Sequence, residues 1–166
     1  AKLEFIELND GETVQVGTAR VTCKRLNHPG VAGGFRVENG NSVFSYISDA
    51  DLHTDSLLGD DMPADEPEKS QIEELRRGAR DLAHSSDLLV CDTYFLTDEY
   101  RADFGHSTPD DALRLGAESA AKRVAMFHHR PDRSDDSIDE ILARYQAETP
   151  NSMELVAAME GLEVNL

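Results

Sequence analysis

The stretch Asp87-Leu88-Leu89-Val90-Cys91 decides the fold class, because it is a short apolar run between two segments with helix-start signals. An apolar run without polar alternation is typical of a strand buried inside a sheet. Upstream, Ser70-Gln71-Ile72-Glu73 is a capping box and predicts a helix that runs to about His84. Downstream, Thr108-Pro109-Asp110-Asp111 combines a Thr cap, a proline and two acidic residues, which predicts the start of a second helix.

The rest of the C-terminal part continues this alternation. Residues 123–127 form another apolar run and predict a strand, and Ser134-Asp135-Asp136 predicts a third helix that reaches about Ala147. Two short runs, 156–159 and 162–166, predict closing strands. The order of elements is therefore α-β-α-β-α-β, which is typical of a layered α/β domain.

The N-terminal third predicts strands instead of helices. Apolar and polar residues alternate there, and Asn39-Gly40-Asn41 between two strand-like runs is a strong hairpin signal. We expect one β-meander with strands at 3–8, 13–16, 19–26, 34–38 and 42–47. The meander and the α-β alternation together predict a single domain over residues 1–166, of the layered α/β or α+β class, with an acidic loop at residues 48–69.

Composition excludes several classes of protein. The 166 residues include 16 basic and 33 acidic ones, a net charge of −17 that argues against nucleic-acid partners and anionic membranes. No run approaches the ~18 apolar residues of a membrane-spanning helix. Cys23 and Cys91 lie far apart in apolar runs, so we expect neither a disulfide framework nor a cysteine zinc site. A reducing, cytoplasmic location fits this use of cysteine.

Three polar residues follow predicted strands, namely His28, Asp49 and His128. Ligands of α/β sheets bind beyond the C-terminal ends of strands, and two imidazoles with one carboxylate suit zinc or non-haem iron. Each of these residues, taken alone, is more often a loop residue, a turn former or a helix cap. Their spacing along the chain does not show whether they converge.

A second pair of polar residues has a similar placement. His106, in Gly105-His106-Ser107-Thr108, precedes a predicted helix, and Asp92 ends a predicted strand. A carboxylate at that position can accept the ring N–H of the histidine and orient it as a proton donor. The alternative is a glycine turn with a Thr cap, in which the histidine has no function. Since adjacent side chains alternate in direction, only one of His128 and His129 should face a site.

Four stretches of the chain resemble the C-terminal part of the metallo-β-lactamase fold, in the branch with phosphodiesterase-like and ribonuclease Z-like hydrolases. They follow the family's order and span almost the whole chain. They are Leu26–Glu38 with its histidine, glycine turn and G-F-R strand, Phe44–Asp49, Asp87–Tyr94 together with Gly105–Thr108, and Met126–Asp135. This resemblance implies one half of an αββα sandwich.

The resemblance also implies roles for the candidate residues. His28 would bind one metal ion, Asp49 would bridge two, His128 would bind the other, and Asp92 with His106 would form an acid–histidine pair. The implied cofactors are two divalent metal ions that hold a bridging hydroxide, with zinc ahead of iron or manganese. The implied reaction is hydrolysis of a small-molecule phosphoester, phosphodiester or other ester.

One family motif does not occur in the sequence. The string H-x-H-x-D-H, which supplies four ligands from the family's N-terminal half, is absent. We therefore expect an incomplete hydrolase that holds metal weakly and that self-associates or needs an N-terminal half. Two other classes stay open, namely a di-iron module of the same fold that binds O₂ or handles electrons, and a scaffold without catalysis.

Overall fold

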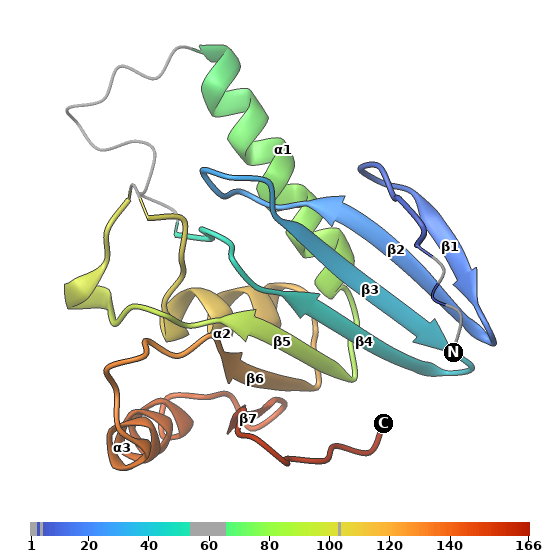
Figure 1. Cartoon of the computed structure of the whole chain (residues 1–166). Coiled ribbons are helices and arrows are strands. Elements are labelled where there is room, and N and C mark those ends of the chain that lie inside the picture. The colour runs from blue at the N-terminus through green and yellow to red at the C-terminus, as the bar shows by residue number, and fades with distance from the viewer. Residues whose placement is uncertain (1–2, 4, 54–65, 103) are drawn as a thin grey trace.

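The computed structural model describes residues 3, 5–53, 66–102 and 104–166. They form one seven-stranded sheet in the order β1-β2-β3-β4-β5-β6-β7 (Figure 1). The strands are β1 (Thr13–Val16), β2 (Ala19–Arg25), β3 (Gly33–Asn39), β4 (Ser42–Ile47), β5 (Leu88–Asp92), β6 (Arg123–Phe127) and β7 (Glu154–Ala157). The helices are α1 (Glu66–Ala83), the short 3-10 helix η1 (Thr97–Glu99), α2 (Pro109–Glu118) and α3 (Asp135–Gln146). This is the layered class that the sequence predicts.

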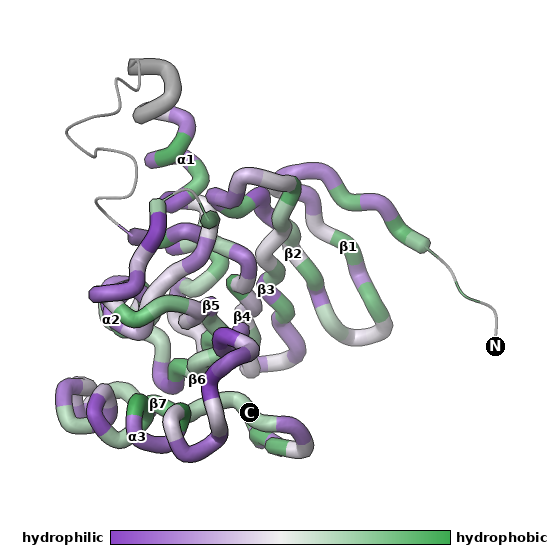
Figure 2. Tube along the Cα trace, turned by 60° about the vertical axis from the view of Figure 1, so that its left-hand side comes forward, coloured by the Kyte–Doolittle hydropathy of each residue, from purple (hydrophilic) through white to green (hydrophobic). Residues whose placement is uncertain are grey.

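The antiparallel half of the sheet, β1 to β4, is built by short connections. The predicted hairpin is confirmed, since Asn39 pairs with Ser42 and Gly40 has a φ of +61° in the loop between them. A positive φ favours glycine because a Cβ atom is strained there. Hydrophobic and hydrophilic residues alternate along β2 and β3 (Figure 2), so the two faces of the sheet differ in polarity.

The parallel half, β4 to β7, carries the helices. A helix connects each pair of neighbouring strands. Such crossovers are right-handed, and because the strands follow one another in one direction across the sheet, the three helices lie on the same face. Leu82 of α1, Leu115 of α2 and Tyr145 of α3 share one buried core with Leu89 and Met126 of the sheet. Among the described residues, no helix is both long enough and apolar enough to cross a membrane.

The opposite face of the sheet carries apolar side chains that are only half-buried. The strand register places Val37, Phe44, Tyr46, Val90 and Phe127 on this surface, which we call the open face. Tyr46 and Phe127 pack edge to face across β5, with ring centroids 5.7 Å apart. An apolar surface that its own chain covers only in part is typical of contact with another element or another chain.

Two predicted strands and two predicted element boundaries are wrong, and part of a fifth prediction lies outside the described residues. Residues 162–166 and the described residues of 3–8 form no strand, and Phe5 there is 89% exposed, because no described strand pairs with either segment. Helix α1 begins at Glu66 rather than near Ser70, since a proline in the first turn costs no hydrogen bond. The last strand is β7 and ends before Met159. Of the predicted acidic loop, residues 54–65 lie outside the described residues.

Two helical glycines give a matched test of the packing between helices and sheet. A Cβ atom at Gly116 in α2 would lie 2.5 Å from Val124 Cγ2 and 2.8 Å from Met153 Sδ. At Gly78 in α1, the nearest atom would be Lys24 Cδ at 3.4 Å, an ordinary contact. We expect Gly116→Ala to lower the free energy of unfolding by about 1–3 kcal/mol through overpacking.

The control Gly78→Ala should raise the free energy of unfolding by about 0.5–1 kcal/mol, because alanine is the better helix former. Urea denaturation followed by circular dichroism measures both changes. Equal effects of the two substitutions would contradict the close approach of α2 to β6.

Candidate metal centre

The site lies at the ends of three neighbouring parallel strands. Asp49 follows β4, Asp92 ends β5 and His128 directly follows β6. Asp49 and His128 have φ values of +54° and +57°, a left-handed backbone that few residues other than glycine adopt. Two such residues, after the two strands that flank β5, indicate local strain that the surrounding structure must hold in place.

Four side chains converge at this edge of the sheet. The candidate ligand atoms of Asp49, Asp92, His106 and His128 all lie within 4.8 Å of one another, so these residues could hold a metal ion. His128 Nε2 and Asp49 Oδ1 are 3.1 Å apart. Their side chains are 36% and 51% exposed, whereas that of Asp92 is fully buried, so the cluster opens to solvent on the side of Asp49.

Asp92 has both carboxylate oxygens in use. Its Oδ2 accepts the ring N–H of His106 at 2.8 Å and the backbone N–H of Ala50 at 3.3 Å, and its Oδ1 accepts the backbone N–H of Tyr94 at 3.0 Å. The hydrogen bond to Asp92 raises the pKa of His106 above 6.5, against the opposing effect of burial. Asp92 therefore orients His106 and favours its protonated form.

His106 is held in place by its neighbours as well as by Asp92. The ring of Tyr94 stacks on it, with centroids 4.7 Å apart and planes tilted by 20°. Gly105 has a φ of +83°, and a Cβ atom there would collide with Pro29 and His28. The glycine of the G-H-S-T segment is thus required both for its backbone conformation and for the close approach of the His28 loop.

The remaining sequence candidates lie close to this cluster but outside it. The ring centroid of His28 is 5.8 Å from that of His106, and His28 Nδ1 accepts the backbone N–H of Gly30. His28 is not among the four residues with ligand atoms within 4.8 Å. Of the histidine pair, His128 faces Asp49, and burial lowers the pKa of His129.

Sequence reasoning assigned no role to two residues that shape the site. Ser107 is completely buried and hydrogen-bonds to the loop that follows Asp49. Tyr94 forms one wall of the site. Ser107 belongs to the G-H-S-T segment and Tyr94 follows the strand that ends at Asp92, so position alone could have marked both residues, although only the fold shows what they contact.

Comparisons with known proteins agree with this architecture. The metallo-β-lactamase fold protein YhfI from Bacillus subtilis superposes with a TM-score of 0.65 and 18% identity, over 95% of this chain and 54% of that one. The short form of human tRNase Z, ELAC1, has a TM-score of 0.55 and 18% identity, over 90% and 44% of the two chains. A diphosphatase of the PhnP family has a TM-score of 0.55 and 15% identity, over 94% and 46%.

No protein-family model matches the chain, and no curated protein matches it by sequence. The chain spans about half the length of the solved structures that it matches. The strand order, the helices and these superpositions together show that the chain has about half of the metallo-β-lactamase fold.

Proposed function

We propose that the chain is part of a metal-dependent hydrolase that acts on small phosphodiesters, phosphoesters or related esters. The observation that carries the proposal is the convergence of Asp49, Asp92, His106 and His128 within 4.8 Å at one edge of the sheet. Two proteins with the same fold are named tRNase Z and diphosphatase, and both names point to reactions at phosphate groups. A nucleic-acid substrate is not part of the proposal, because a net charge of −17 repels phosphate backbones.

The donor set fits a divalent metal ion. Asp49 Oδ1 and His128 Nε2 lie 3.1 Å apart and face each other, and imidazole with carboxylate suits zinc first and iron or manganese next. We propose these two residues as ligands; Asp49 would be shared between two ions, and His28 would hold the second ion when the site is complete. Such ions supply Lewis-acid polarisation of the ester and lower the pKa of bound water.

We propose His106 as the proton donor to the leaving group. Asp92 holds its Nδ1–H, so Nε2 is the ring nitrogen that can donate to a substrate. The raised pKa of His106 supports this role, because a general acid must carry its proton near neutral pH. Asp92 acts through His106, since its own oxygens already accept three hydrogen bonds from the protein.

The proposed partner of the open face is a second half of the same fold. The matched structures are about twice as long as this chain, and the open face is apolar yet only half-buried. Such a half would also bring further metal ligands. They are needed for tight binding, because this chain would supply only two protein ligands per ion. A chain without it should cover the open face by self-association.

Our first prediction separates the two adjacent histidines by metal binding. The isolated chain should bind Zn²⁺ weakly, and His128→Ala should weaken binding at least tenfold further because it removes a ligand. His129→Ala is the matched control and should bind like the wild type. Isothermal titration calorimetry measures all three proteins, with circular dichroism to verify their folding.

If His129→Ala weakened zinc binding and His128→Ala did not, the ligand would be His129 instead of His128. Tight binding of two zinc ions, with phosphodiesterase turnover at ordinary enzyme rates, would show that the site is complete without a second half. Preferential retention of iron with a visible absorption band would favour a redox module instead.

The second prediction concerns pH. In metal-free protein, the pKa of His106 should lie above 6.5, and Asp92→Asn should bring it down toward 6.5, because a neutral amide replaces the carboxylate that stabilises the protonated ring. The pair therefore contributes stability that is complete below about pH 6.5 and is lost as pH rises through the raised pKa. NMR titration of the histidine ring signals measures both values, and His129 serves as an internal control. An unchanged His106 titration in the variant would contradict the pairing.

The third prediction concerns the open face. Sedimentation velocity on the isolated chain should show self-association that increases with concentration, because the apolar side chains there are only half-buried. Val37→Lys on β3 should shift the chain toward monomer, whereas Val31→Lys, in a loop and already 96% exposed, should not. A wild-type chain that is monomeric at all concentrations would argue against this use of the open face.

A further inference from the structure

The turn that presents Asp49 is held by hydrogen bonds from outside it. Asp49 itself has a left-handed backbone, which costs free energy for any residue with a Cβ atom. The next residue, Ala50, donates its N–H to Asp92, and its carbonyl accepts the hydroxyl of Ser107. The same hydroxyl oxygen accepts the N–H of Leu52 at 3.0 Å, so one buried side chain bridges two backbone groups of the turn.

A second set of hydrogen bonds holds Asp51, the residue between Ala50 and Leu52. The N–H of Asp51 donates to the backbone carbonyl of Asn27 at 2.7 Å, and Asn27 Nδ2 donates to the carbonyl of Asp51 at 3.0 Å. The side chain of Asp51 is not available to the site, because it accepts from Tyr100 and from the backbone of His53. Asn27 precedes His28 and Ser107 follows His106 in sequence, so the turn is tied to both of these segments.

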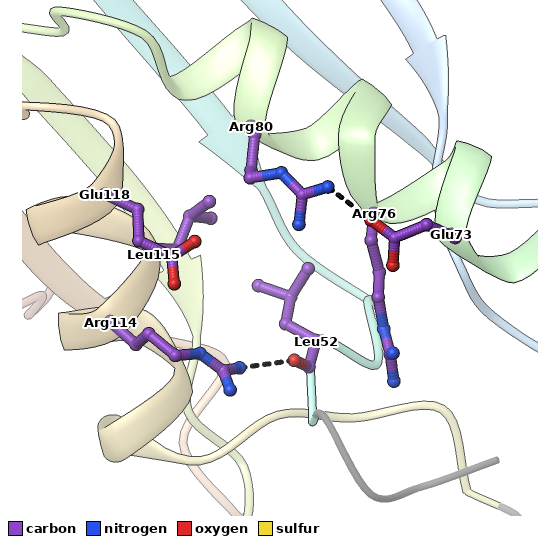
Figure 3. Close-up of a pocket in the computed structure, with 7 residues that line it drawn as sticks. All are labelled: Leu52, Glu73, Arg76, Arg80, Arg114, Leu115 and Glu118. Atoms are coloured by element: carbon purple, nitrogen blue, oxygen red, sulfur yellow. Dashed lines mark hydrogen bonds and ion pairs between the residues drawn. The ribbon is translucent and has the colours of Figure 1, made fainter. Parts of the chain in front are cut away.

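The far end of the turn is anchored to the helices. Arg114 of α2 donates to the carbonyl of Leu52 at 2.6 Å, and a dashed line marks this bond in Figure 3. Arg76 donates to the carbonyl of His53. The backbone N–H and carbonyl groups from Ala50 to Leu52 are therefore paired outside the turn, which leaves it a single conformation.

We propose that Ser107 and Asn27 are positioning residues that hold Asp49 in its left-handed conformation, with its carboxylate facing His128. They do so by fixing the backbone of the three residues that follow Asp49, since a strained conformation persists only where its surroundings determine it. The consequence of this positioning, metal binding through Asp49, rests on the proposed function. The positioning itself is a property of the metal-free protein.

The test uses two variants of the full chain and one matched control. Ser107→Ala removes the bridging hydroxyl, and Asn27→Ala removes the donor to the Asp51 carbonyl. The control, Ser119→Ala, removes another buried hydroxyl, one with no hydrogen-bond partner among the described residues. Amide hydrogen exchange of Ala50, Asp51 and Leu52 in metal-free protein reports the turn directly. Co²⁺ titration followed by visible absorption reports the consequence at Asp49.

We expect Ser107→Ala to speed exchange at Leu52 at least tenfold and to weaken Co²⁺ binding at least tenfold with altered absorption bands. Asn27→Ala should do the same to a smaller degree, and Ser119→Ala should change neither readout. If Ser107→Ala fails to fold, Asn27→Ala serves as the test by itself. Faster amide exchange within the turn and weaker Co²⁺ binding, at an unchanged melting temperature, would then support the positioning role.

The two proposals fail in different ways. A wild-type chain that binds no Co²⁺ would overturn the metal site, while faster exchange confined to the turn in Ser107→Ala would still support the positioning role. Wild-type exchange rates in the turn in both variants, or Co²⁺ affinity lowered equally by Ser119→Ala, would overturn the positioning role.

Discussion

The buried carboxylate of Asp92 is the group on which the site depends. Its side chain has no exposure to water, so the fold must satisfy both oxygens internally. The donors come from Ala50 after β4, Tyr94 after β5 and His106 before α2. One carboxylate therefore joins the end of β5 to two segments that lie 42 and 14 residues away in sequence. Removing any donor leaves a buried charge less satisfied, at a cost of about 1–3 kcal/mol.

The charge of the chain and the chemistry of the cluster are consistent with each other. Asp49 and Asp51 also raise the pKa of His106, although less than Asp92 does. Carboxylates gathered near one another repel, and a divalent cation or a protonated imidazole relieves that repulsion. A net charge of −17 also attracts cations to the whole surface, which is consistent with the metal site proposed at this edge of the sheet.

Much of the fold could be predicted from local patterns. The hairpin at Gly40 follows from the need for positive φ, and the cap at Thr108 is present as predicted, with Asp111 completing it. The first segment of the chain shows where such patterns fail. Phe5 and Ile6 have a strand-like composition, yet no described strand pairs with them, and a strand exists only through its partner.

The sequence by itself determined which residue types stand at the strand ends, because strand limits and polar residues after them are local properties. It also determined that at most one of His128 and His129 faces the site. Only the tertiary structure decided that Asp49, Asp92, His106 and His128 meet, that His28 stands apart from them, and that Ser107 ties the turn in place. The reason is that parallel strands are joined through helices, so neighbours in the sheet lie far apart along the chain, and only the sheet register brings them together.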